Sequence, residues 1–481
     1  MNETELAYTS AVDLAAMIRK RDVSPVEVAE LFLTRIKASQ PALNAFLAIA
    51  GERAVAEARA AEALVMRGGA DLPPLLGVPY TVKDLIDTEG VRTTYASLAL
   101  ADNIPAADGV TVARMKQSGA VMLAKTTTPE FGHKPMNEAP IFGKTHNPWD
   151  LQRTCGGSSG GSGAAVAAGL GPLSIGTDAG GSTRIPAACC GIVGIKATLG
   201  RVPHDIAPDA FGNFANQGPM ARTVADAALM LQVLSGSDPR DPHSHGLPDG
   251  NYVAAARGEG DLKGLRVAWR PRMGNRLVDP EILAACEDML SVLRDLGAVV
   301  EELDEPLENA EPHWLVITQS LWVARFEHLL DKWGDKLTPT LARGIKEGAD
   351  YTAVELQRAV VWRTQLFRRV QQWFGQHDLL VTPTLARTAL DIDHDFYAPV
   401  RIAGEEAGSI RQNWYPYTHP FNMTGHPAIT IPCGWMSDGL PAAFQIVGPL
   451  MGEERMLRVA AMLEAARPWA HKRPSVPGLN V

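Results

Sequence analysis

Short apolar runs that alternate with helical segments constrain the fold of this chain most strongly. The runs at 75–84, 120–126 and 173–178 are apolar or β-branched and are bounded by turn residues or charge, as buried strands are. The segments 109–119 and 162–169 have the spacing or the small residues of helices. Such alternation predicts an α/β protein, with a large mixed β-sheet covered by helices on both faces.

The order of these patterns along the chain predicts one large domain. Helices are expected over about 8–68, and a core of strands and helices over about 72–240. The stretch of about 260–400 is mostly helical, and strand patterns resume after it, for example at 427–434. Because the strands resume, we interpret 260–400 as an elaboration of a single domain that covers residues 1–481.

Composition excludes several classes of protein. Hydrophobic residues make up 46% and charged residues 21% of the 481 residues, which is typical of a globular protein. The net charge of −9 and the lack of a basic run argue against nucleic-acid binding. The acidic N-terminus does not resemble a signal peptide, and no window has the roughly 20 apolar residues of a membrane span. We therefore expect a cytoplasmic protein without a membrane partner.

The cysteines and histidines predict neither a disulfide framework nor a metal site. The five cysteines are odd in number and lack CxxC spacing, so free buried thiols are expected. No two histidines have clear metal-ligand spacing. His133 and His426 lie in segments that could border a pocket, but structural roles are favoured for both. We predict no metal and no cofactor.

A glycine-serine stretch, "CGGSSGGSG" at 155–163, has five glycines in nine positions. A flexible linker is disfavoured because the stretch continues directly into "AAVAAG". A phosphate-binding loop is disfavoured because the lysine and hydroxyl residue that end such a motif are missing. A catalytic loop remains, in which glycines allow close backbone approach and a serine hydroxyl carries protons.

One catalytic interpretation is a nucleophile elbow. The residues from Gly157 to Gly161 satisfy GxSxG, which would make Ser159 the nucleophile of an α/β-hydrolase. The pattern is weak, since an elbow directly follows a buried strand. The preceding "NPWDLQRT" is typical of a turn and loop instead.

Two further features favour another arrangement. In "IGTDAGGSTRIPAACCG" (175–191) a strand ends at Asp178, and two glycines then precede Ser182. Consecutive backbone N–H groups beside a serine could form an oxyanion hole. Lys83 ends the apolar run "GVPYTVKD". Snorkelling to solvent would explain a lone lysine there, but burial would lower its pKa and make it a general base.

Together these motifs resemble the amidase signature family. The resemblance rests on "PYTVKD", "GGSSGGS" and "GTDAGGSTRIPAACCG", with Lys83 75 residues before Ser158 and Ser182 24 residues after it. It extends to "NPWD", "GIVGIKATLGRVP", "GPMARTVADAALML" and "PFNMTGHPAITIPCG". Most of 5–240 and 415–465 is covered, whereas the middle of the chain is not. The resemblance implies the amidase signature fold.

The resemblance also implies a catalytic set of Lys83, Ser158 and Ser182. Lys83 would take the proton of Ser158, which is usually preceded by a cis peptide bond, and Ser158 would take that of Ser182. Ser182 would then attack the amide carbonyl and form an acyl-enzyme. The backbone N–H groups of an oxyanion hole are assigned to Ala179, Gly180, Gly181 and Ser182. Supporting positions fall on Ser159, Thr177, Asp178 and Arg184.

The substrate is predicted to be a small linear or cyclic amide, and a homodimer is compatible with the sequence. Gly132 and Trp414 are expected to contact the substrate. Tryptophans in the variable part would suit an apolar or aryl group, although tryptophan at helical spacing is more often core. The supposed aromatic wall consists of Trp314, Trp322, Trp333, Trp362 and Trp414.

Three alternatives stay open. The family includes the A subunit of glutamine-dependent tRNA amidotransferases, but residues 201–223 depart from what is expected of that subunit. An α/β-hydrolase would be labelled at Ser159 and would depend on a histidine. A non-catalytic binding protein would keep the scaffold, but the complete set of Lys83, Ser158 and Ser182 argues against it.

Overall fold

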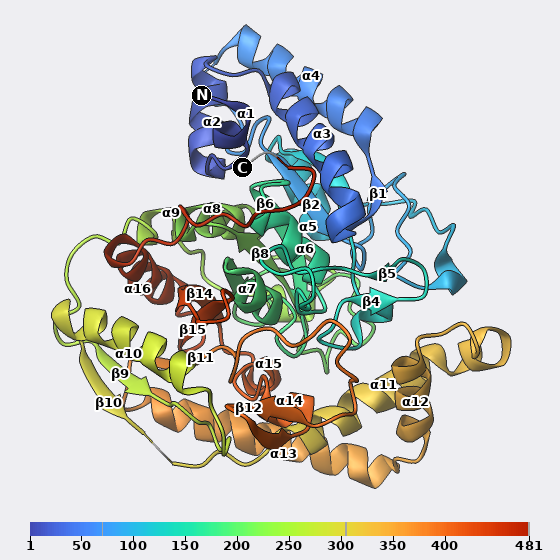
Figure 1. Ribbon diagram of the computed structural model, residues 1–481, viewed down its shortest axis with the longest axis vertical. Helices are drawn as coiled ribbons and strands as arrows, with labels where there is room; N and C mark the ends of the chain where they lie inside the picture. Colours follow the sequence, from blue (N-terminus) through green and yellow to red (C-terminus); the bar gives the residue numbers. More distant parts are fainter. Residues whose placement is uncertain (70, 304, 480–481) are drawn as a thin grey trace.

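A mixed sheet of eleven strands forms the centre of the protein (Figure 1). The computed structural model describes residues 1–69, 71–303 and 305–479. Helices flank the sheet, so the predicted α/β class is confirmed. In spatial order the strands are β1 (Phe46–Ile49), β3 (Val121–Thr126), β2 (Pro79–Lys83), β6 (Leu173–Asp178), β8 (Asn216–Ala221), β7 (Val193–Lys196), β14 (Ala428–Trp435), β15 (Pro441–Val447), β11 (Leu379–Pro383), β9 (Arg266–Trp269) and β10 (Val299–Glu302).

Parallel pairing at the centre of this sheet positions the candidate site. β2 pairs in parallel with both β3 and β6, and Val82 lies opposite Ile175 of β6. All residues of β2 are buried, and β6 is buried except for Thr177, as expected of strands with covered faces. The carboxyl ends of β2 and β6 therefore meet at one edge, which brings Lys83 near Thr177 and Asp178.

Two helices follow the glycine-rich segments and pack on each other beside these strands. α6 (Gly160–Ala167) begins directly after Ser159, and α7 (Arg184–Cys190) begins directly after the turn that follows β6. Every residue of both helices is buried. Their small side chains, mostly glycine and alanine, allow this close packing.

The remaining helices enclose the sheet and form the two ends of the molecule in Figure 1, with α1–α4 at one end and α11–α13 at the other. In chain order up to α10, and with the C-terminal α16, these helices are α1 (Glu3–Ala7), α2 (Ala11–Lys20), α3 (Pro25–Leu43), α4 (Gly51–Arg67), α5 (Val110–Gln117), α8 (Val224–Leu234), α9 (Tyr252–Ala255), α10 (Pro280–Asp295) and α16 (Glu453–Ala466). The others are α11 (Glu311–Trp333), α12 (Pro339–Ala349), α13 (Ala353–Phe374), α14 (Ile410–Asn413) and α15 (His419–Thr424).

The variable middle of the chain contributes to the same sheet. β9, β10 and β11 continue it beyond β15, and β9 pairs in parallel with both of its neighbours. Two small hairpins lie outside the main sheet, β4 (Glu138–Ala139) with β5 (Gly143–Lys144) and β12 (Val400–Ile402) with β13 (Glu405–Gly408). Short 3-10 turns occupy Leu98–Leu100, Glu130–Gly132 and Pro242–Ser244. No helix in the described ranges is long and apolar enough to cross a bilayer.

Candidate active site

Lys83 lies at the end of β2 with no solvent exposure. Its Nζ donates to Ser158 Oγ and to Thr177 Oγ1, at 2.7 Å each. Burial lowers the pKa of Lys83 well below its usual value of 10.5, and the charge of Asp178 opposes this shift only in part. The structure therefore places a readily deprotonated amine against the hydroxyl of Ser158.

The glycine-serine loop comes close to several other segments, which explains its glycines. A Cβ at Gly161 would lie 2.3 Å from Thr127 Oγ1, and one at Gly160 would lie 2.6 Å from Asn137 Cβ. A Cβ at Gly157 would lie 2.7 Å from a backbone carbon of Pro135. Only glycine fits at such contacts. The peptide bond between Gly157 and Ser158 is cis, and Ser158 is almost completely buried.

Ser159 is held by backbone groups on both sides. Its Oγ accepts from the N–H of Thr177 and donates to the carbonyl of Thr177, at 3.2 Å each. Its own N–H donates to the carbonyl of Ser182, at 3.1 Å. These bonds fix α6 against the end of β6. They do not suit a nucleophile elbow, because Ser159 follows a loop and its hydroxyl is already engaged.

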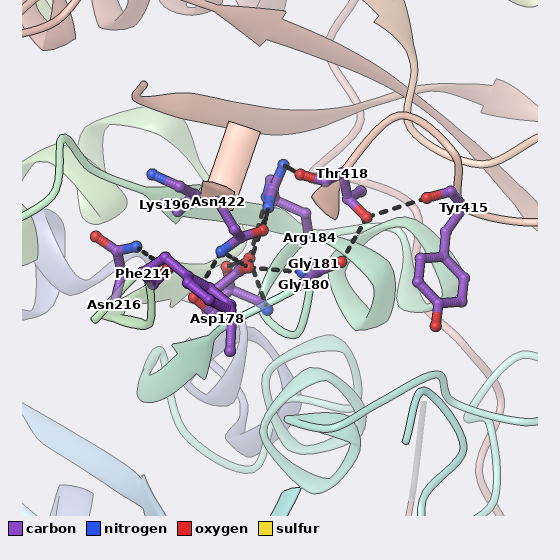
Figure 2. A network of polar contacts seen from close by, with 12 residues as sticks. Asp178, Gly180, Gly181, Arg184, Lys196, Phe214, Asn216, Tyr415, Thr418 and Asn422 are labelled. Atoms are coloured by element: carbon purple, nitrogen blue, oxygen red, sulfur yellow. Dashed lines mark hydrogen bonds and ion pairs between the residues drawn. The ribbon is translucent and has the colours of Figure 1, made fainter. Parts of the chain in front are cut away.

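A buried ion pair organises the turn between β6 and α7 (Figure 2). Arg184 Nη2 lies 3.0 Å from Asp178 Oδ1, and both side chains are at most 1% exposed. Arg184 also donates to the carbonyl of Thr418, to Gln445 Oε1 and to Asn422 Oδ1. Burial would raise the pKa of Asp178, but Arg184 and hydrogen bonds from its neighbours lower it below the ordinary value. Asp178 therefore stays charged inside the protein.

The backbone N–H groups of this turn differ in whether they have a hydrogen-bond acceptor. The N–H of Gly181 donates to Asp178 Oδ1, at 2.7 Å. The N–H groups of Ala179, Gly180 and Ser182 have no acceptor among the described residues. Thr418 Oγ1 donates to the Gly180 carbonyl, which fixes the turn from the opposite side (Figure 2). The turn thus offers three unpaired N–H groups near Ser182, and the predicted donor Gly181 is already used internally.

Ser182 opens onto two spaces of unequal size. The large cavity has a volume of about 500 Å³, and the small space has a volume of about 40 Å³. The large cavity lies between α11, α13 and the segment 204–215. Both spaces are lined by Gly132, His133, Ala179, Ser182 and Trp314. Ser158 and Thr177 line the large cavity.

Of the two residues predicted to contact substrate, Gly132 lines both spaces beside Ser182 and Trp414 lines neither. A Cβ at Gly132 would lie 3.3 Å from Ser158 Oγ, so the backbone of Gly132 borders the reacting groups. Trp414 has no solvent exposure, and its Nε1 donates to the carbonyls of Arg387 and Thr388. The prediction that Trp414 contacts substrate is therefore wrong, because the indole is packed in the core away from either space.

Sequence reasoning missed the role of Trp314. Its Nε1 donates to the carbonyl of Ala179 at 3.1 Å. A Cβ at Gly180 would lie 3.2 Å from the Trp314 ring. The sequence marks it only as one of several tryptophans of a supposed aromatic wall. Of that group, Trp314 and Trp322 line the large cavity. Helical spacing alone could not distinguish these two from their neighbours.

The two histidines take structural positions, as favoured from the sequence. His133 Nδ1 is 2.7 Å from the Glu130 carbonyl, and its Nε2 is 2.6 Å from Thr340 Oγ1. Its ring nevertheless forms part of both spaces beside Ser182. His426 stacks on Phe374, with ring centroids 5.1 Å apart, and lines neither space.

The cysteines and acidic residues give no sign of a metal centre. In the described ranges no group of three or more His, Cys, Asp or Glu residues could hold a metal ion. All five cysteines are unpaired thiols: Cys155, Cys189, Cys190, Cys286 and Cys433. Burial raises the pKa of each of the buried thiols, those of Cys155, Cys189, Cys190 and Cys286.

Comparison with known proteins identifies the family. The sequence profile of the family described as Amidase matches residues 27–457. An acylamidase from Rhodococcus erythropolis is 39% identical, over 99% of both chains. The A subunit of the glutamyl-tRNA(Gln) amidotransferase from a Roseiflexus species is 37% identical, over 98% of this chain and 99% of that protein.

Solved structures agree with these sequences. A bacterial aryl acylamidase of the amidase signature family superposes with a TM-score of 0.89 at 30% identity, over 96% of this chain and 97% of that one. The 6-aminohexanoate cyclic dimer hydrolase superposes with a TM-score of 0.86 at 32% identity, over 97% and 99%. The protein belongs to the amidase signature family of amide hydrolases.

Proposed function

We propose that the protein hydrolyses the C–N bond of a small-molecule amide through an acyl-enzyme on Ser182. The contact between Lys83 Nζ and Ser158 Oγ, at the edge of the cavity that Ser182 lines, is the observation that carries this proposal. The depressed pKa of Lys83 supports its role as the base. Gly132 forms part of the substrate-contact surface.

The reaction proceeds by proton transfer through Ser158. Lys83 accepts the proton of Ser158 Oγ, and Ser158 accepts that of Ser182 as Ser182 Oγ bonds to the carbonyl carbon. The unpaired N–H groups of Ala179, Gly180 and Ser182 stabilise the negative charge that develops on the carbonyl oxygen. The C–N bond then breaks, the departing nitrogen takes the proton from Ser158, and Ser158 regains one from Lys83, which is neutral again. Water then attacks the ester and gives a proton to Ser158, and Ser158 passes its own proton to Ser182 Oγ as the acid leaves.

A covalent probe tests the nucleophile directly. A fluorophosphonate should label Ser182 in pure protein, and Ser182→Ala should remove both the labelling and the release of amine. Ser159→Ala is the matched control on the neighbouring hydroxyl and should still be labelled. Labelling at Ser159, or near-normal amide hydrolysis by Ser182→Ala, would overturn the assignment.

The same assay separates a free amide hydrolase from one chain of an amidotransferase complex. The pure chain should release amine from small amides without a partner protein, glutamine or tRNA. Activity that appeared only with added partner chains would favour the second function, which the likeness to the Roseiflexus protein would then explain.

We also propose that residues 1–481 form one domain. Strands from before, within and after the variable middle pair in the same sheet, and a single group of buried side chains extends from α1 to the C-terminal segment. A truncated chain that ended before β9 would lose five strands of this sheet, namely β9, β10, β11, β14 and β15.

A further inference from the structure

The two spaces beside Ser182 differ in size, and this difference indicates where the acyl half and the amine half of the substrate bind. Ser182 lines both the large cavity and the small space, so each space is open to one of the two substituents of an amide carbonyl bonded to Ser182. We infer that the enzyme is selective for short-chain acyl amides of bulky apolar amines, with the acyl carbons in the small space and the amine in the large cavity. This inference rests on the proposed function.

The position of Ser158 decides which half enters which space. In the proposed reaction Ser158 returns the proton to the departing nitrogen, so that nitrogen must lie on the side of Ser158. Ser158 and Thr177 line the large cavity. Within the described residues, the small space is bordered instead by Gly157, Gly180 and Ile185. The amine therefore extends into the large cavity, and the acyl carbons extend the other way.

The small space limits the length of the acyl group. One water-sized sphere needs about 10–15 Å³ of such volume, so about 40 Å³ holds roughly three non-hydrogen atoms. Contacts hold its walls in place: Tyr415 packs edge-on against His419, and Trp314 Nε1 donates to the Ala179 carbonyl. Acetyl and propionyl groups fit this space, whereas a phenyl or hexanoyl group does not.

The large cavity, in contrast, has room for a bulky group and a largely apolar surface. Its volume of about 500 Å³ is within the range of ligand pockets. Apolar side chains from several elements form much of its surface, including those of Leu85, Phe131, Phe214, Ile317, Leu321 and Val360. Burying an aryl or branched alkyl amine against these side chains is favourable because it removes apolar area from water. The amine half therefore provides most of the binding energy.

Arg411 forms the outer wall of the small space. Its guanidinium lies over the Trp314 ring at 5.4 Å and the Phe396 ring at 4.8 Å, and it is 3.9 Å from Glu311. Arg411 also lines a third space of about 190 Å³, which Glu311 and His133 share with the small space. Removing the Arg411 side chain should join the two spaces and lengthen the acyl group that fits.

Two isomeric amides test the assignment in the wild-type enzyme. N-benzylacetamide and N-methyl-2-phenylacetamide contain the same atoms and both release an alkylamine, but the phenyl ring is on the amine half of the first and the acyl half of the second. We expect kcat/KM for N-benzylacetamide to be at least about tenfold higher, which corresponds to 1.4 kcal/mol. Equal values, or a preference for N-methyl-2-phenylacetamide, would overturn the inference.

Failure of the inference can be distinguished from failure of the proposed function. If a fluorophosphonate labels Ser182 but neither isomer is hydrolysed, the acyl-amine assignment is wrong and the nucleophile remains. If Ser182 is not labelled and neither isomer is hydrolysed, the proposed function itself fails.

A wall variant tests the role of Arg411. Arg411→Ala should raise the ratio of kcat/KM for N-benzylhexanamide to that for N-benzylacetamide by at least about fivefold. Arg276→Ala is the matched control, since Arg276 also pairs with a glutamate but is 64% exposed and lines neither space. An unchanged ratio in folded Arg411→Ala would overturn the assignment of this wall. If the variant does not fold, the isomer comparison decides alone.

Discussion

Lys83 illustrates how one residue can serve chemistry at the expense of stability. An amine with no exposure to water has lost the solvation of its charged form, and its neighbours Ser158 and Thr177 are neutral hydroxyls. The protein therefore folds with this amine poised to be neutral. An exposed lysine would be protonated near neutral pH and could not act as a base.

The pH dependence of stability should report this amine. Below pH 10.5 the unfolded chain binds a proton at Lys83 that the folded protein binds only at lower pH, because the folded pKa is depressed. The stability of wild type relative to Lys83→Met should thus rise with pH in that window, by up to about 1.4 kcal/mol per unit. Urea unfolding of both proteins between about pH 7 and 9 measures it.

The same variant also tests catalysis. Lys83→Met should lower kcat/KM for amides by about 10²–10⁴-fold, which is the typical contribution of a general base. For the wild type, kcat/KM should fall as the pH drops through the depressed pKa of Lys83. A stability difference that did not vary with pH would show that Lys83 is charged in the folded protein.

The sequence could be used to predict the candidate catalytic residues, but not which aromatic side chains line the cavity. The resemblance to the amidase signature family singles out Lys83, Ser158 and Ser182. In the structure Lys83 contacts Ser158, and Ser158 and Ser182 line the same cavity. Trp314 and Trp414 are both aromatic residues of the variable part, yet one borders the site and the other is core. Both are buried, and which of them borders the site depends on tertiary contacts that no local pattern encodes.

At the level of elements, the glycines around α6 determine how closely helix and strand can approach. Gly161→Ala would place a Cβ 2.5 Å from the Thr127 nitrogen and 2.7 Å from the Ala45 carbonyl, and neither backbone can move aside cheaply. We expect a loss of at least about 3 kcal/mol in unfolding free energy. Chemical denaturation measures it.

A second glycine provides the matched control. Gly51 begins α4, and a Cβ there would be 4.0 Å from its nearest neighbours on Leu33. Gly51→Ala should be neutral or more stable by up to about 1 kcal/mol. Equal effects of the two substitutions would mean that close packing is not the reason for glycine at 161.

Most elements could be predicted, and the exceptions have physical reasons. The patterns for β2, β3, β6 and β7 are clear because these strands are short apolar runs. β8 escapes prediction because "NQGPMA" contains Gly218 and Pro219, which are rare in central strands. β1 escapes it because four residues between two helices carry too little periodicity.

At the level of the whole molecule, Arg363 connects three segments that are distant in sequence. From α13 it donates to the Met423 carbonyl of α15 at 2.7 Å, and to the carbonyls of Gly212 and Asn213 at 2.9 and 3.2 Å. The segment 204–215 lines the large cavity, so Arg363 helps to hold one of its walls.

Removing this connection should affect binding more than chemistry. Arg363→Ala should raise KM for N-benzylacetamide several-fold with little change in kcat, and should speed proteolysis within 204–215. Arg358→Ala, an exposed arginine on the same helix, is the control and should leave both unchanged. A fall in kcat without a change in KM would mean that Arg363 supports the reacting groups instead.

The reacting groups and the walls around them come from separate stretches of the chain. Lys83, Ser158 and Ser182 stand at the central strands, whereas α11, α13 and the segment 204–215 enclose the large cavity. Mutations in the enclosing segments can therefore change which substrates such an enzyme accepts, while its catalytic residues stay unchanged. Evolution could adapt this chain to new amides by changing these enclosing segments alone.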